Sequence, residues 1–282
     1  MKYVNFFGHK VSKLILGDNP FNGHSYIANF INGKEMVEYS TEDRILEAMH
    51  QMEELGVNTM LPLADPYIIR ILRHYRANGG KMNFIFQLYQ PMNTEVSMRL
   101  MQDVDPIGVY VSGSFSDVRF ETGRTNEIHD MLKLLRGMDI KVGLGTHHPE
   151  MIAASEREGW DTDFYMACMY NFRRRREGEE SGFLTGKSKA GIVVEPADRP
   201  LMLKALQGVK KPVIAFKLFA GGQMLVEKTP EERHALITDV YDTVFGALKP
   251  DDFGVIGVFQ KYHDQIAEDI AIFDEWAEKR GI

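Results

Sequence analysis

The chain has 282 residues, of which 44% are hydrophobic and 26% are charged, a composition typical of a folded chain with one large or two modest domains. Its net charge of -7 and pI of about 5.8 argue against nucleic-acid binding, and its single cysteine excludes an intramolecular disulfide framework. No apolar run approaches the ~20 residues that cross a bilayer, and the first residues show no signal peptide, so we expect a cytoplasmic protein without a membrane partner.

Short apolar runs alternate with amphipathic stretches along the whole chain. Each run is too short for a helix and too continuous for a half-exposed strand, which predicts parallel strands covered on both faces. The predicted strands are Leu14–Gly17, Val57–Leu63, Met82–Tyr89, Ile107–Ser112, Ile140–Gly145, Phe164–Met169, Val213–Phe219 and Phe253–Phe259. Eight such units predict a (β/α)8 TIM barrel, with a doubly wound open sheet as the alternative.

Two of the helices between these strands carry clear start signals. Thr41 precedes two acidic residues and an apolar pattern that ends at Gly56. Thr229 precedes Pro230 and two glutamates, which suits a hydroxyl cap followed by acids at the positive end of the helix dipole. We therefore expect one helix after the first strand and another after the seventh to begin at these positions.

Two long connections interrupt the alternation, one over residues 21–39 and one over residues 172–197. The second holds Arg173–Arg176 and several glutamates that balance them, which indicates a lid-like loop rather than a nucleic-acid contact. Asp198 is expected to lie at the start of the helix after this loop. No internal repeat or linker is visible, so residues 1–282 are predicted to form a single domain.

Several segments, taken in order, resemble the aldo-keto reductase superfamily. They are Phe7–Gly17, Gly56–Thr59, Val142–Glu150, Tyr170-Asn171 and Ile214–Gly222. The resemblance implies a barrel preceded by an amino-terminal β-hairpin and, within that family, carbonyl reduction with NADPH by an Asp-Tyr-Lys-His tetrad.

The tetrad itself is missing from the corresponding positions. Leu61 stands in the place of the Asp, Gln87 in that of the Lys and Ser112 in that of the His, and only Tyr67 lies near a tetrad position. The cofactor positions are also altered, for example to Phe216 where the family has a stacking Tyr. The chain therefore resembles a divergent branch, for which NADPH is implied by resemblance alone and the cofactor is left open.

Polar residues near the carboxyl ends of the predicted strands are expected to meet at the barrel mouth. We predict Lys217, Asp18 and His147 as catalytic residues, because amine, carboxylate and imidazole groups perform acid/base and carbonyl chemistry. The predicted substrate-binding residues are Asn19, His24, Asp65, Gln87, Asn171 and Lys261.

Each of these residues also has a purely structural interpretation. Lys217 could form an ion pair with Asp18 or Asp65, and Asp18 could only initiate a turn before Pro20. His147 and His148 point to opposite sides of an extended segment, so at most one faces the mouth, and both could cap the next helix.

The sequence gives weaker signals for a metal site or a reactive thiol. No pair of histidines has the spacing that places two ligands on one element, so no metal site is predicted. Cys168 is expected to be a buried structural thiol unless an electropositive neighbour such as His147 activates it.

Three functions remain open at this point. The first is an enzyme that acts on a small polar metabolite, a sugar or a hydroxy or keto acid, by acid/base or carbonyl chemistry. The second is an NAD(P)H-dependent oxidoreductase whose proton relay is rebuilt through Tyr67 or His147. The third is a non-catalytic barrel used as a binding subunit, and a homo-oligomer is compatible with all three.

Overall fold

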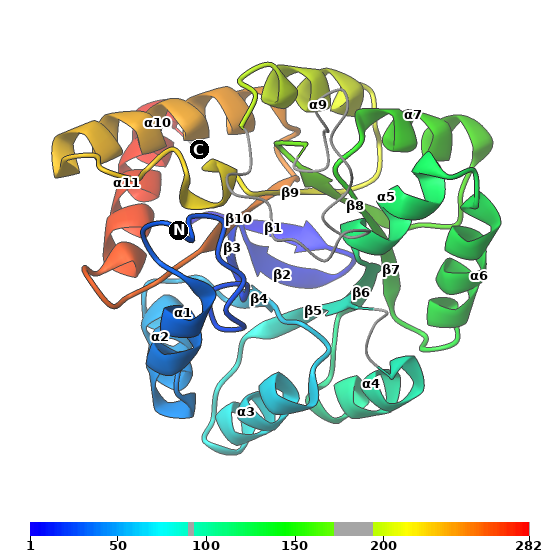
Figure 1. Cartoon of the computed structure of the whole chain (residues 1–282), viewed down its shortest axis with the longest axis horizontal. Helices are drawn as coiled ribbons and strands as arrows, with labels where there is room; N and C mark the ends of the chain where they lie inside the picture. The colour runs from blue at the N-terminus through cyan, green and yellow to red at the C-terminus, as the bar shows by residue number, and fades with distance from the viewer. Residues whose placement is uncertain (90–92, 172–193, 282) are drawn as a thin grey trace.

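Eight parallel strands close into a barrel in the computed structural model, which describes residues 1–89, 93–171 and 194–281 (Figure 1). The strands follow one another around the barrel in chain order, and the last pairs with the first. They are β3 (Leu14–Gly17), β4 (Thr59–Leu61), β5 (Asn83–Leu88), β6 (Gly108–Val111), β7 (Lys141–Thr146), β8 (Phe164–Cys168), β9 (Val213–Phe216) and β10 (Phe253–Gly257). Each overlaps a predicted strand, so the predicted barrel is confirmed and the open sheet is wrong.

Helices surround the barrel and cover its outer face (Figure 1). They are α1 (Gly33–Tyr39), α2 (Glu42–Glu54), α3 (Pro66–Ala77), α4 (Thr94–Met101), α5 (Gly113–Glu121), α6 (Thr125–Arg136), α7 (Pro149–Glu158), α9 (Asp198–Leu206), α10 (Pro230–Ala247) and α11 (Gln265–Arg280), with short 3-10 turns at Gln102–Val104 and Ala220–Gly222. In the part of the chain that the structure describes, no helix is both long and apolar enough to span a membrane.

The predicted helix starts at Thr41 and Thr229 are confirmed. The Thr41 hydroxyl accepts a hydrogen bond from the amide of Arg44, and Thr229 forms a reciprocal capping box with Glu232. Helix α9 begins at Asp198 as expected, whereas residues 172–193 of the predicted lid lie outside the described residues.

The long connection predicted after the first barrel strand contains a helix, α1. The side chain of Asn32 accepts a hydrogen bond from the amide of Glu35 at 2.9 Å and so caps this helix. Asparagine is a favoured cap because its short side chain reaches an amide that has no partner inside the helix. The long connection predicted over residues 21–39 thus also holds a helix start.

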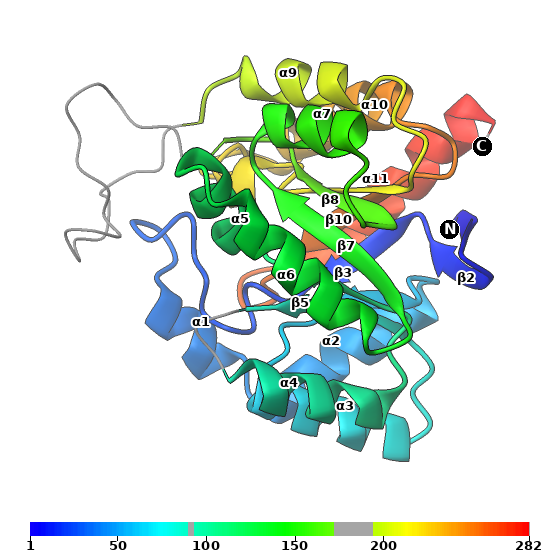
Figure 2. The ribbon, with the colours of Figure 1, turned by 90° about the vertical axis from the view of Figure 1, so that its right-hand side faces the viewer.

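The apolar core has two layers. Most buried side chains lie between the strands and the helices, and a smaller set that includes Ile15, Tyr110 and Met166 fills the barrel interior. The hairpin of β1 (Tyr3–Phe6) and β2 (His9–Ser12) closes one end, where the Phe6 ring lies 5.2 Å from the Phe164 ring. This confirms the expected amino-terminal hairpin, and Figure 2 shows it on the opposite side of the barrel from the connection that leads to α1.

Candidate active site

The Lys217 ammonium and the His147 imidazole meet at the carboxyl end of the barrel. Lys217 Nζ lies 3.0 Å from His147 Nε2, although the two residues are 70 positions apart in the chain. His147 follows β7 and is 7% exposed, and Lys217 follows β9 and is partly buried. Two nitrogen atoms at this distance form a hydrogen bond only when one of them presents a lone pair, so the pair shares a proton.

A buried carboxylate of helix α5 orients the imidazole. His147 Nδ1 lies 2.6 Å from Asp117 Oδ2, and the Asp117 carboxylate also accepts hydrogen bonds from the His147 amide and from the Thr146 hydroxyl at 2.7 Å. Asp117 is fully buried, and its charge therefore needs these donors. A proton on Nδ1 that is donated to Asp117 leaves the Nε2 lone pair facing Lys217.

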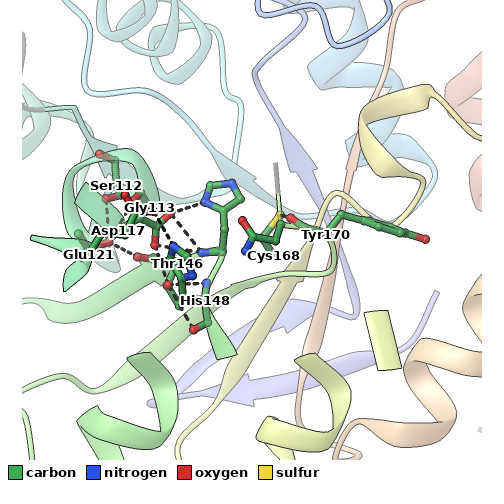
Figure 3. Close-up of polar contacts among 12 residues, drawn as sticks. Ser112, Gly113, Asp117, Glu121, Thr146, His148, Cys168 and Tyr170 are labelled. Carbon is green, nitrogen blue, oxygen red and sulfur yellow. Dashed lines mark hydrogen bonds and ion pairs between the residues drawn. The ribbon is translucent and has the colours of Figure 1, made fainter. Parts of the chain in front are cut away.

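Helix α5 comes close enough to hold Asp117 because it begins with a glycine. A Cβ atom at Gly113 would lie 3.1 Å from two atoms of the His147 ring. Figure 3 shows Ser112, Gly113, Asp117 and Thr146 gathered on one side of Cys168, while Tyr170 extends to the other side. The first turn of α5 and the end of β7 thus form one packed unit around the imidazole.

The backbone of Lys217 explains how this side chain reaches the mouth. Ile214 packs in the barrel interior and Ala215 packs on the outer layer, so a regular strand would direct position 217 outward. Lys217 instead adopts φ of 56°, the left-handed region that residues other than glycine rarely occupy. Such strained residues gather at functional sites, where the surrounding structure holds them.

Cys168 is a third reactive group of this cluster. It ends β8 between the strands that carry His147 and Lys217, it is 1% exposed, and its Sγ atom donates to the carbonyl oxygen of Tyr170 at 3.0 Å. Burial raises the pKa of the Cys168 thiol, but the positive charges of His147 and Lys217 outweigh burial and lower that pKa below its ordinary value. The electropositive neighbour that a reactive thiol requires is therefore present.

The same charges act on the imidazole. Burial lowers the pKa of His147, but the negative charges of Cys168 and Asp117 outweigh both burial and the Lys217 charge and raise it to about 9. His147 and Cys168 therefore stabilise each other's charged form. A histidine held in this way can store a proton at neutral pH and release it to a neighbouring group.

Asp18 lies buried at the end of β3, where it is 3% exposed. Its Oδ2 atom accepts hydrogen bonds from the Leu63 amide at 2.5 Å and from Asn22 Nδ2 at 2.8 Å. Burial raises the pKa of the Asp18 carboxyl to about 7, against these hydrogen bonds, which lower it. Burial and the charge of Asp18 in turn raise the pKa of the Tyr110 hydroxyl, so these two side chains lie within electrostatic range of each other.

Three predicted binding residues lie around these groups. Asn19 Nδ2 donates to the Tyr26 hydroxyl at 3.2 Å, and the oxygen of the Gln87 amide accepts from the Tyr110 hydroxyl at 3.0 Å. Desolvation lowers the pKa of His24, and the charge of Lys217 lowers it further, which places His24 within electrostatic range of the amine.

The other three predicted binding residues have local structural partners. The Asp65 carboxylate caps helix α3, and the Lys261 ammonium lies 2.7 Å from Glu35. The backbone amide of Asn171 donates to Asp198 at 3.1 Å and so connects the end of β8 to the start of α9. Of the two adjacent histidines, His148 points to Glu121 at 2.8 Å and His147 reaches the mouth.

Sequence reasoning missed Asp117, Tyr26 and Tyr110. No spacing connects Asp117 to a histidine 30 residues later, because helix packing alone brings them together. Tyr26 and Tyr110 had a weak signal, since one lies in the long connection after β3 and the other at the end of a barrel strand.

The described residues do not fit the NADPH site that the family resemblance implies. Lys261, Tyr262 and Gln260 follow β10, but they contact the acidic side chains of Glu35 and Asp264. Carboxylates at this position oppose the binding of a phosphate group. Tyr67 is 47% exposed, and desolvation and the charge of Glu42 raise the pKa of its hydroxyl, which makes it a weaker acid.

A metal centre finds no support in the described ranges either. Within residues 1–89, 93–171 and 194–281, no group of three His, Cys, Asp or Glu side chains is arranged to hold a metal ion.

Comparison with known proteins identifies the fold but no family. No protein-family model matches the chain, and no curated protein has a similar sequence. Among solved structures, an aldo-keto reductase from Bacillus halodurans in its holo form has a TM-score of 0.57 at 11% identity, over 97% of this chain and 90% of that chain.

Two further structures extend this comparison. An aldo-keto reductase from Klebsiella pneumoniae in complex with NADPH has a TM-score of 0.56 at 13% identity, over 97% of this chain and 89% of that chain. A dihydropteroate synthase from Xanthomonas albilineans has a TM-score of 0.52 at 13% identity, over 99% and 98%. The aldo-keto reductase resemblance is thus structural, is shared with another barrel enzyme and shows the TIM-barrel fold alone.

Proposed function

We propose that the protein is an enzyme that acts on a small polar carbonyl compound, a sugar or a hydroxy or keto acid, through the amine of Lys217. The observation that carries this proposal is the relay in which Asp117 Oδ2 lies 2.6 Å from His147 Nδ1 and His147 Nε2 lies 3.0 Å from Lys217 Nζ. A carboxylate, an imidazole and a nucleophile in line form the arrangement that activates nucleophiles in many enzymes.

The first step in this proposal frees the amine. The proton that the two nitrogen atoms share passes from Lys217 Nζ to His147 Nε2, which favours holding it because the pKa of His147 is raised to about 9, and Asp117 stabilises the imidazolium. The neutral amine then attacks the carbonyl carbon, so that a C–N bond forms and the π electrons move to the oxygen. The imidazolium gives its proton to this oxygen, and the neutral His147 Nε2 then takes one proton from the positively charged nitrogen, which leaves a neutral carbinolamine.

Loss of water from the carbinolamine would give an imine, and protonation of its nitrogen would draw electrons from the neighbouring carbon. Asp18 is suited to move a proton at that carbon, because its pKa of about 7 allows both protonation states near neutral pH. Asn19 and His24 are proposed to bind the polar groups of the substrate. The reaction class is thus proton transfer next to a carbonyl, or cleavage of an adjacent bond.

Trapping with sodium borohydride tests this proposal, because borohydride reduces an imine to a stable secondary amine. The protein is incubated with a panel of small hydroxy aldehydes and keto acids and then reduced, and labelled peptides are identified by mass spectrometry. We expect the label on Lys217, its loss in Lys217→Met and its retention in Lys204→Met, which removes an exposed lysine of α9. Equal labelling of the wild type and Lys217→Met would refute the proposal.

The NAD(P)H-dependent alternative rests on the fold shared with an aldo-keto reductase bound to NADPH. A ligand that binds only the folded state raises its thermal stability, so a higher melting temperature with millimolar NADPH would favour this alternative. A barrel that neither forms imines nor binds NADPH would instead fit the third function, a non-catalytic binding subunit.

A further inference from the structure

The ring of Tyr26 lies against the Lys217 amine, in a contact that the proposed chemistry does not use. Lys217 Nζ lies 4.5 Å from the ring centroid, within the range of a cation–π interaction. Tyr26 belongs to the connection between β3 and α1, and its hydroxyl accepts a hydrogen bond from Asn19 at 3.2 Å. The ring therefore covers one side of the amine while His147 occupies another.

Gly221, in the connection after β9, provides the surface on which the Tyr26 ring rests. A Cβ atom at Gly221 would lie 2.7 Å from two carbon atoms of the Tyr26 ring, and Gly221 also has φ of 65°. A Cβ atom at Gly222 would contact Ile27, and Gln223 Nε2 donates to the carbonyl oxygen of Tyr26 at 3.1 Å. The connection after the first barrel strand is thus docked on the connection after the seventh.

A second aromatic ring lies close to the same pair of nitrogen atoms. Phe216 packs against the His147 ring in an edge-to-face arrangement with centroids 5.6 Å apart, and Lys217 Nζ lies 5.6 Å from the Phe216 centroid. Rings on more than one side leave little room for a bulky group beside the amine. They also restrain the flexible lysine chain in the rotamer that reaches His147.

We propose that Tyr26 is a positioning and specificity-determining residue, whose ring holds the Lys217 amine toward His147 and limits the site to small aliphatic carbonyl compounds. This inference rests on the proposed role of Lys217 in carbonyl chemistry. It adds the size class of the substrate and assigns that selection to the contact between Tyr26 and Gly221.

Two amine-modifying reagents of different size test this inference without any turnover. Methyl acetimidate is small, whereas trinitrobenzenesulfonate carries a bulky aromatic ring, and mass spectrometry measures the rate at which each labels Lys217. We expect Tyr26→Ala to raise labelling by the bulky reagent at least about tenfold relative to the small one, as steric discrimination by a pocket predicts. Tyr26→Phe keeps the ring and should keep the wild-type ratio.

Two further variants test the same contact without changing Tyr26. Gly221→Ala displaces the ring from the other side, so it should shift the ratio in the same direction as Tyr26→Ala. Tyr262→Ala, at a tyrosine that is 62% exposed, serves as the control and should leave the ratio unchanged. Melting temperatures of all variants are measured to show that each is folded.

An unchanged ratio in both Tyr26→Ala and Gly221→Ala would overturn the inference. So would a wild-type Lys217 that reacts with the bulky reagent as fast as the exposed Lys204. Failure of borohydride trapping together with an intact size ratio would instead remove the carbonyl chemistry and keep the Tyr26 barrier. The two proposals therefore fail in different experiments.

Discussion

At the scale of single residues, the chemistry of the mouth depends on which proton each group holds. Asp117 makes His147 a proton acceptor toward Lys217, and it does so without touching the amine itself. Asp117 is therefore a positioning residue, whereas Lys217 and His147 are the proposed catalytic residues. This division of roles can be tested by changing the charge of the carboxylate while its shape is kept.

We expect Asp117→Asn to lower the pKa of His147 below its value of about 9, because the carboxylate charge that raises it is removed. The imidazole then loses its proton at a lower pH, and labelling of Lys217 by borohydride falls by about 10²–10⁴-fold, as loss of acid/base assistance predicts. A nuclear magnetic resonance titration of the His147 ring measures the first effect.

The matched control for this variant is Glu121→Gln, which removes a carboxylate 2.8 Å from His148. It should leave the titration of His147 as in the wild type. An identical His147 titration curve in Asp117→Asn and the wild type would contradict the role assigned to Asp117.

At the scale of elements, the first turns of two helices determine the positions of Asp117 and of the segment that contacts Tyr26. Helix α5 delivers Asp117 because Gly113 allows its first turn to approach the His147 ring. Helix α10 begins with the capping box of Thr229 and Glu232 and follows the connection that contains Gly221. The cap anchors the far end of the segment against which Tyr26 rests.

Thr229→Ala should destabilise the protein by about 1 kcal/mol, because the amide of Glu232 loses its hydrogen-bond acceptor. Urea denaturation measures the change in the free energy of unfolding. Thr238→Ala is the control, since Thr238 lies inside the same helix and its hydroxyl only donates to the carbonyl oxygen of His234. A loss of stability no larger than that of Thr238→Ala would show that the cap contributes nothing.

At the scale of the whole molecule, several buried groups make stability depend on pH. Burial, with a smaller contribution from Glu268, raises the pKa of Asp269 in α11 from 3.8 to about 8, against the attraction of Arg233. Between about pH 4 and 8 the folded state therefore holds a proton that the unfolded state has released. The free energy of unfolding must fall as the pH rises through this window.

Asp269→Asn removes this titration and keeps the shape of the side chain. We expect the variant to match the wild type at low pH and to exceed it by on the order of 2 kcal/mol at pH 8, as measured by urea denaturation at each pH. Asp251→Asn, at an exposed position before β10, should show no such pH-dependent difference. A wild type and an Asp269→Asn variant with parallel stability curves would contradict this assignment.

The sequence by itself determined the barrel, because each strand and helix is encoded locally. Apolar runs such as Phe164–Cys168 are covered on both faces, and caps such as Thr229 satisfy amides within one turn, so neighbouring residues suffice to predict them. Strand order then follows from the rule that parallel strands need right-handed crossovers. Helix α1 was missed because its asparagine cap also suits a turn.

The site was predicted only in part. Lys217 and His147 were expected at the mouth because Lys217 lies near the carboxyl end of one predicted strand and His147 follows another. Their 3.0 Å contact depends, however, on a left-handed backbone at position 217 that no residue type signals. Asp65 and Lys261 were expected in the site for the same positional reason, and their partners in the structure are the start of α3 and Glu35.

Only the tertiary structure decided which groups share protons and charge. Asp117 reaches His147 across 30 residues, and Tyr26 rests on Gly221 across the barrel mouth, through contacts that arise when the barrel closes. Burial, which sets the pKa of Asp18 and Asp269, is likewise a property of the closed fold. Local sequence preferences determine the strands and helices of the barrel. Long-range packing determines the protonation of its buried groups, because electrostatic effects depend on distance and solvent exposure rather than on position in the chain.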